Sequence, residues 1–134
     1  MDAAAVQKMV DPMFPGTMGV KILEVSPDRV TAELEVRQGL CTRHDTLHGG
    51  AYMAFADTLG AVGTIVSLPK GARTSTLESK TNFLGSAPLG TKVLGESTPL
   101  HRGRTTQVWT TRITNEQGKL LAVVTQTQII IPAT

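Results

Sequence analysis

Hydrophobic and polar residues alternate along the first part of the chain. Residues 29–37 follow a strict two-residue period, with apolar side chains at Val30, Ala32, Leu34 and Val36. This period is typical of a strand with one buried face. Residues 19–25 are also strand-like, and Ser-Pro-Asp at 26–28 supplies a turn between the two segments. The pattern predicts a β-hairpin with one face in solvent.

A long apolar segment, residues 47–66, comes next and carries one carboxylate, Asp57, near its middle. Large side chains recur three or four residues apart, as on the buried stripe of a helix, at Tyr52, Phe55, Leu59, Val62 and Val66. Another face of the helix consists mostly of small residues: Met53, Asp57, Gly60, Ala61 and Thr64. A small face favours close packing, and a second copy of the same helix is the simplest partner. Asp57 is therefore expected to point at a subunit interface.

Four more strand-like segments, rich in Thr, Val and Ile, occupy the C-terminal half: residues 73–84, 91–101, 104–114 and 119–131. Asn-Glu-Gln-Gly at 115–118 predicts a hairpin loop between the last two. The predicted order is β-β-α-β-β-β-β. One long helix among antiparallel strands must bury itself against their sheet, which predicts an α+β fold with about five to six strands.

The length of 134 residues predicts a single domain, 1–134. Residues 1–14 are expected to be an N-terminal extension with a short helix, ended by Pro12 and the Phe-Pro-Gly that follows. A net charge of +2 and an aromatic content of 4% argue against a nucleic-acid partner. One cysteine, Cys41, and the absence of a secretory signal pattern favour the cytoplasm.

A membrane span is the main alternative for residues 46–69, which hold one formal charge over a bilayer-spanning length. The central Asp57, the pair Gly49-Gly50 and the strand-like sequence elsewhere favour a buried helix instead. We therefore expect no membrane partner.

Four possible metal ligands lie within eight residues: Cys41, His44, Asp45 and His48. A catalytic metal site would normally recruit a ligand from elsewhere, and His101 is the only other histidine. The preferred interpretation is a loop before a helix, with no metal and no cofactor, while a metal hydrolase is a weaker alternative.

Two glycine-containing stretches are candidates for binding negative charge. His48-Gly49-Gly50 precedes the helix, where unobstructed backbone N–H groups form an anion or oxyanion site, although a simple turn accounts for the glycines equally well. Arg102 and Arg104 flank Gly103 between two predicted strands. They are either phosphate ligands or part of a turn in solvent.

These residues together resemble the hotdog-fold thioesterases, specifically the 4-hydroxybenzoyl-CoA and phenylacetate-pathway branch. The resemblance extends from about residue 15 to 131. It rests on Leu47-His48-Gly49-Gly50 with Asp57 nine positions after His48, on the Leu100–Thr105 turn, on the strand around Val108-Trp109, and on Asn115–Leu120.

The resemblance implies a long helix wrapped by an antiparallel sheet, a homo-oligomer that is at least a dimer and in the family a tetramer, and metal-free hydrolysis of acyl-CoA thioesters. It assigns the nucleophile or general base to Asp57 and the backbone donor to the thioester carbonyl to Gly49. The implied site residues also include the catalytic positions His48 and Thr42 and the substrate-binding positions Gly50, Ala61, Thr76, Arg102, Arg104 and Thr105. Relatives often carry Asn or Gln at the position of Thr42, whose hydroxyl is shorter.

The spacing of Asp57 and Gly49 adds a structural demand. Eight helical residues rise about 12 Å, too far for both groups to act on one carbonyl. If both act, Asp57 of one subunit must meet Gly49 of its partner. The leading interpretation is a hydrolase for an aromatic or short-to-medium acyl-CoA. Alternatives are a thioesterase for acyl groups on a carrier protein and, in view of Thr42, a non-catalytic acyl-CoA-binding protein.

Overall fold

The computed structural model describes all 134 residues. Its helices are α1 (Ala3–Val10), α2 (Phe14–Met18) and α3 (Gly49–Ile65), with a 3₁₀ turn η1 (Gln38–Leu40). Its strands are β1 (Lys21–Ser26), β2 (Arg29–Glu35), β3 (Cys41–Thr42), β4 (Thr46–Leu47), β5 (Arg73–Phe83), β6 (Lys92–Arg102), β7 (Thr106–Asn115) and β8 (Leu120–Ile131). The N-terminal hairpin, the long helix and the four C-terminal strands are confirmed.

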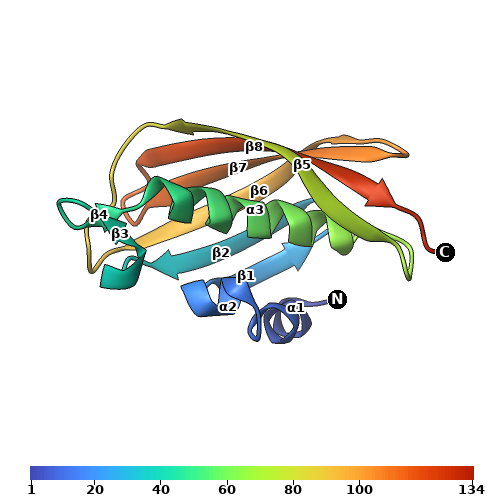
Figure 1. Ribbon diagram of the computed structural model, residues 1–134, viewed down its shortest axis with the longest axis horizontal. Helices are drawn as coiled ribbons and strands as arrows, with labels where there is room; N and C mark the ends of the chain where they lie inside the picture. Colours follow the sequence, from blue (N-terminus) through green and yellow to red (C-terminus); the bar gives the residue numbers. More distant parts are fainter.

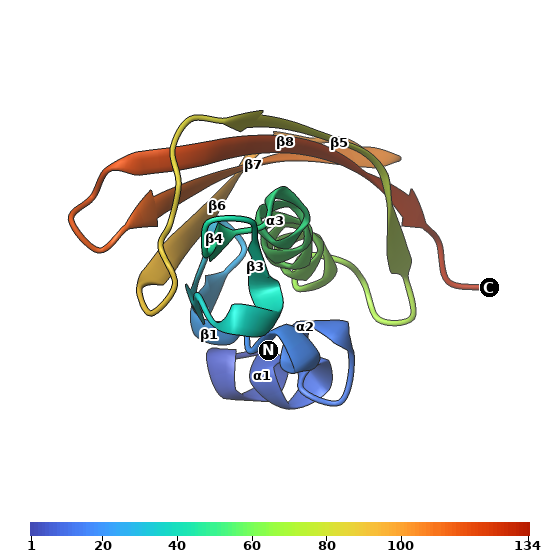
Figure 2. The same ribbon diagram turned by 60° about the vertical axis from the view of Figure 1, so that its left-hand side comes forward.

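Six strands form one antiparallel sheet in the order β1-β2-β6-β7-β8-β5 (Figure 1). The sheet curves around α3, which lies along its concave face, and α1 and α2 lie beyond the β1 side (Figure 2). The α+β prediction of a long helix wrapped by an antiparallel sheet is confirmed. The short pair β3-β4 forms a separate ladder just before α3.

The buried stripe of α3 packs against this concave face as the periodicity predicts. Tyr52, Phe55, Leu59 and Val62 are buried, and Val66 packs at the edge of the core just beyond the helix. Burial of this stripe fixes the rotation of α3 about its axis and therefore the direction of Asp57. None of the helices combines the length and hydropathy that a bilayer crossing requires.

The small-residue face of α3 requires a correction, because part of it packs on the chain's own sheet. A Cβ at Gly60 would lie 2.3 Å from Cδ of Gln126 on β8. Thr64 is fully buried, and its hydroxyl donates to the Gly60 carbonyl at 2.9 Å. Only Met53, Asp57 and Ala61 of that face are half-exposed in the chain. Gly60 and Thr64 are therefore small because β8 and its neighbours approach closely.

The N-terminal segment has the predicted short helix, α1, and departs from the prediction after Pro12. Phe-Pro-Gly lies inside a second helix, α2, and Pro15 occupies its first turn, where a missing N–H is tolerated. The guanidinium of Arg37 donates to the carbonyls of Met18 and Thr17 and so caps the end of α2. The segment is more than an extension, since Val6 of α1 is completely buried in the core.

The two edges of the sheet differ. The β1 edge is covered by α1, because Gln7 accepts from the Ile22 N–H at 2.7 Å and donates to the Val20 carbonyl at 3.0 Å. Strand β5 pairs only with β8, so its other edge has no strand beside it in the chain. An open edge of eleven residues is a ready site for strand pairing.

Candidate active site

Asp57 lies half-buried between α3 and the strands β5 and β8. Its Oδ1 accepts a hydrogen bond from the Thr76 hydroxyl at 2.6 Å and a longer one from Nε2 of Gln126 at 3.3 Å. The Oδ2 atom makes no hydrogen bond within the chain. The carboxylate is therefore held through one oxygen and presents the other.

Thr76 occupies an inward-facing position of β5, just before a register shift between Thr76 and Glu78. The sequence placed Thr76 among substrate-binding residues, whereas its hydroxyl is a direct partner of Asp57. The shift is a β-bulge, a feature that re-aims side chains near functional sites.

The N-terminus of α3 is organised by His48. The His48 side chain accepts the Gly50 N–H at 2.7 Å through Nδ1, and its carbonyl accepts the N–H groups of Ala51 and Tyr52. Because Nδ1 is the acceptor, the neutral ring carries its proton on Nε2. The Gly50 N–H, one of the predicted substrate-binding groups, is thus engaged in the helix cap.

The N–H of Gly49 remains free, with no acceptor within the chain. It points from the positive end of a seventeen-residue helix, where a developing negative charge is favoured. The ring of Phe83, at the end of β5, covers this position, since a Cβ on Gly49 would lie 3.3 Å from it.

Tyr52 supports the Phe83 ring in an edge-on contact, with ring centroids 5.9 Å apart at an interplanar angle of 69°. Its hydroxyl donates to the Gly85 carbonyl at 3.3 Å. Burial raises the pKa of Tyr52 above its ordinary value of 10.0, so the phenol stays neutral and apolar in character. Phe83 and Tyr52 together make an aromatic wall beside the free Gly49 N–H.

Asp57 and Gly49 are not brought together within one chain, because both belong to the same continuous helix. Ala61, one turn beyond Asp57, is half-exposed on the same side of α3. Thr42 lies on β3, paired with Thr46, and its exposed side chain makes no hydrogen bond in the chain. The chain alone therefore presents two separate half-sites.

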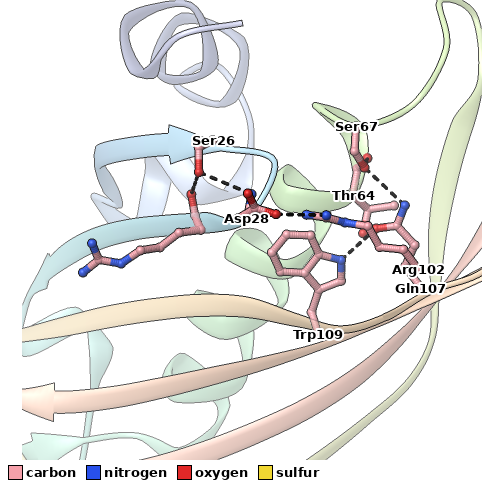
Figure 3. A network of polar contacts seen from close by, with 8 residues as sticks. Ser26, Asp28, Thr64, Ser67, Arg102, Gln107 and Trp109 are labelled. Atoms are coloured by element: carbon pink, nitrogen blue, oxygen red, sulfur yellow. Dashed lines mark hydrogen bonds and ion pairs between the residues drawn. The ribbon is translucent and has the colours of Figure 1, made fainter.

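The two arginines of the Leu100–Thr105 turn have different surroundings. Arg102 forms an ion pair with Asp28 at 3.1 Å, and its guanidinium lies 5.6 Å from the ring centroid of Trp109 (Figure 3). The buried indole donates to Gln107 at 2.9 Å, and Gln107 donates to Ser67 at 3.2 Å. Arg102 thus tethers β6 to the β1-β2 turn.

Arg104, by contrast, has no ion-pair partner and is exposed. It lines a groove of about 390 Å³ between the end of α3 and the start of β7, together with Ser67, Leu68, Pro69, Ala72, Gly103, Gln107, Ile130, Pro132 and Ala133. No carboxylate lines this groove. Thr105 is exposed beside it, and its carbonyl accepts the Ile130 N–H at 2.9 Å.

The four possible metal ligands before α3 have other contacts. Cys41 Sγ lies 3.4 Å from the Arg37 carbonyl, Asp45 accepts from Gln38 at 3.2 Å, and His48 caps the helix. No three of these side chains gather into a group that could hold a metal ion.

Two site residues escaped the sequence interpretation, Gln126 and Gln128 on β8. They continue the inward-facing register of Ala122 and Val124 and are almost completely buried. The sequence does contain a signal for them, because two glutamines at consecutive inward positions of an apolar strand need buried hydrogen-bond partners.

Comparison with known proteins agrees with this architecture. Residues 44–122 match the family model described as the thioesterase superfamily. The chain belongs to this superfamily. It is 31% identical over 107 residues to the 1,4-dihydroxy-2-naphthoyl-CoA hydrolase of Listeria monocytogenes, covering 80% of this chain and 86% of that protein.

Solved structures give the same result. A Haemophilus influenzae thioesterase superposes with a TM-score of 0.92 at 26% identity, covering 98% of this chain and 91% of that one. The phenylacetic acid degradation protein PaaI of Thermus thermophilus superposes with a TM-score of 0.80 at 26% identity, covering 87% of this chain and 96% of that one. The superfamily member described here has the hotdog fold and is a thioester hydrolase.

Proposed function

We propose that this thioesterase hydrolyses acyl-CoA with an aromatic or short-to-medium acyl group to the free acid and CoA. The observation that carries the proposal is the half-buried Asp57 carboxylate, with Oδ1 bonded to Thr76 and Oδ2 free. The name of the Listeria relative, a hydrolase of an aromatic acyl-CoA, supports the aromatic choice.

Thioester hydrolysis needs a nucleophile and a donor to the carbonyl oxygen, whereas a thiolate leaves without a strong general acid. Asp57 Oδ2 either attacks the carbonyl carbon or removes a proton from the attacking water. The Gly49 N–H donates to the carbonyl oxygen as its negative charge grows, with support from the helix dipole. His48 fixes this helix end through its cap.

We place these two groups in different subunits of a homo-oligomer. Strand β5 carries Thr76, the partner of Asp57, and ends at Phe83, the neighbour of Gly49. Its outer edge is open, whereas α1 covers the β1 edge. Antiparallel pairing of two β5 strands about a two-fold axis would therefore bring the Asp57 region of one subunit to the Gly49 region of the other.

Charge complementarity favours one register for this pairing. Glu78 and Lys80 are both exposed on the outer face of β5, and neither has an ion-pair partner in the chain. A two-fold axis at Ser79 sets Glu78 opposite Lys80 of the partner subunit, twice per dimer. Because Leu77 is the extra residue of the β-bulge, the same register sets Thr76 opposite Thr81 of the partner subunit, two residues before the partner's Phe83. A dimer is thus the minimum unit, and a tetramer of two such dimers fits the family resemblance.

For the CoA phosphates we propose Arg104 with Thr105, at the groove beside α3. Arg104 is exposed, free of ion pairs and not opposed by a carboxylate in that groove. Arg102 is already paired with Asp28 and stacked on Trp109, so its role is to hold the turn. A guanidinium left free of protein partners is the better phosphate ligand.

A non-catalytic acyl-CoA-binding protein is the second candidate, favoured by the short, unbonded side chain of Thr42. Thiol release from a panel of acyl-CoA and acyl-carrier-protein thioesters, with and without a chelator, separates the candidates. We expect chelator-insensitive turnover of acyl-CoA. Tight acyl-CoA binding without turnover would overturn the proposal in favour of the binding protein, and turnover only of carrier-bound acyl groups would change the substrate class.

A further inference from the structure

The carboxylate of Asp57 is the end of a buried polar chain that begins on β8. The amide Nε2 of Gln126 lies 2.9 Å from Oε1 of Gln128, 3.3 Å from Asp57 Oδ1 and 3.3 Å from the Asp57 carbonyl. Gln128 in turn donates to the Thr74 hydroxyl at 3.0 Å. Gln126 and Gln128 are 1% and 0% exposed.

The orientation of the Gln126 amide is fixed by its surroundings. Three oxygen acceptors surround Nε2, and rotating the amide by half a turn would set its carbonyl oxygen against all three. In the orientation present, Gln126 Oε1 is buried without any hydrogen-bond partner. An unpaired buried acceptor is unfavourable, and such groups are tolerated where they serve a site.

Gly60 on α3 makes this arrangement possible. A Cβ at that position would lie 2.3 to 2.6 Å from the three terminal atoms of Gln126. Because Gly60 lacks a side chain, the Gln126 amide reaches the helix one turn from Asp57. A helical glycine normally costs stability relative to alanine, so its presence agrees with a specific requirement for this contact.

The Thr76 hydroxyl completes the arrangement. It lies 2.6 Å from Asp57 Oδ1 and 2.6 Å from Gln128 Oε1, and it has one proton for these two acceptors. The Gln126 amide already supplies a proton to Gln128 Oε1. The Thr76 proton is therefore free to bond the charged carboxylate, which is the stronger acceptor.

We infer that Thr76, Gln126 and Gln128 are positioning residues that hold Asp57 Oδ1 and thereby direct Oδ2 at the thioester. This inference rests on the proposed function, because it assumes that Asp57 is the reacting carboxylate. Thr76 of β5 and Gln126 of β8 contact Asp57 from the sheet side, and Gln128 of β8 acts through them, because its Oε1 lies within hydrogen-bond distance of both. A positioned carboxylate raises turnover without adding to substrate affinity.

The test compares kcat and KM for isosteric variants, using the acyl-CoA that the wild-type enzyme hydrolyses fastest. Thr76→Val and Gln126→Met keep the side-chain shape and remove the donors to Asp57. We expect kcat to fall roughly 10-fold to 100-fold, as for loss of a hydrogen bond to a charged group, with KM changed less than about twofold. Thr76→Ser, which restores the hydroxyl, is expected to return kcat to near the wild-type value.

Thr111→Val is the matched control for a lost buried hydroxyl. Thr111 is fully buried on β7 and donates to Ser97 at 2.9 Å, away from Asp57. This control should lower the melting temperature and leave kcat unchanged. In an Asp57→Asn background, Thr76→Val should cause no further loss of turnover, because there is no carboxylate left to position.

Wild-type kcat in folded Thr76→Val and Gln126→Met, with Asp57→Asn inactive, would overturn this inference and leave the proposed function standing. A rise in KM alone would also overturn it, in favour of a substrate contact. If the wild-type enzyme hydrolyses no acyl-CoA, the proposed function and this inference fall together. If Thr76→Val does not fold, the kcat of Gln126→Met tests the inference. Gln126→Met is expected to destabilise the core less, because it also removes the unpaired buried Oε1.

Discussion

A shared active site predicts that two inactive variants restore activity to each other. Asp57→Asn removes the reacting carboxylate and keeps Gly49, whereas Gly49→Pro removes the backbone N–H and keeps Asp57. In a mixed dimer, one site has both defects and the other has neither. Equal mixing with random pairing makes about half of the dimers mixed, so about a quarter of wild-type activity should return.

The structure indicates that Gly49→Pro is compatible with folding. Gly49 is the first residue of α3 and does not have a positive φ, and proline is favoured at that position. The preceding residue, His48, has φ −64° and ψ 141°, the conformation that a following proline requires. The added ring would meet Phe83, a residue that is 51% exposed in the chain.

Removal of one oxyanion donor typically lowers kcat by about 100-fold to 1,000-fold, so each parent variant gives a low background. Gly49→Ala is the control, because it adds the same Cβ beside Phe83 and retains the N–H. The assay is thiol release after co-refolding, with mixed dimers verified by mass spectrometry. Verified mixed dimers as inactive as their parents would refute the shared site, provided that Gly49→Ala is active and both parents are folded.

Three further outcomes are expected. Asp57→Asn should keep the near-UV circular dichroism of the wild type and lose most turnover, and wild-type turnover in that variant would favour the binding protein. Arg104→Ala should raise KM for acyl-CoA far more than it lowers kcat, as steady-state kinetics will show. Arg102→Ala should mainly lower the melting temperature in thermal unfolding, because it removes an ion pair and a ring contact. Glu78→Lys should shift light-scattering mass toward the monomer and Glu78→Lys with Lys80→Glu should restore the dimer, whereas an unchanged mass in the single variant would contradict the proposed register.

Periodicity predicted the succession of strands and the long helix along the chain, because each segment buries one face and its apolar residues therefore repeat at a regular spacing. The second N-terminal helix did not follow, because Pro15 was interpreted as the end of a helix. Proline ends a helix from inside but is accepted in the first turn, and the carbonyls at the end of α2 are capped by Arg37, far along the chain. Such a long-range cap is not visible in the local pattern.

The site was predicted in part, and its missing members share one physical cause. Asp57, Gly49 and His48 were proposed from the family resemblance, which rests on a local spacing along the chain, and their roles stay predictions. The partners of Asp57 on β8 depend on which strand lies over which turn of the helix, and only the sheet order sets that. The same limitation led to the interpretation of Gly60 as part of a subunit interface, when the neighbour that needs the space is Gln126.

A carboxylate in the middle of an apolar helix is stabilised in this fold from one side only. The donors from Thr76 and Gln126 satisfy Oδ1 from the sheet, and the glycine one turn further along admits the amide that helps to do so. No group in the chain donates a hydrogen bond to Oδ2, and no group in the chain accepts one from the N–H of Gly49. Both unused groups belong to one rigid helix and are about 12 Å apart along its axis, so neither can complete the other in a monomer. The two-fold axis that we propose beside the open edge of β5 would resolve this, because it would reverse the helix direction and set the acid of one subunit against the helix start of the next.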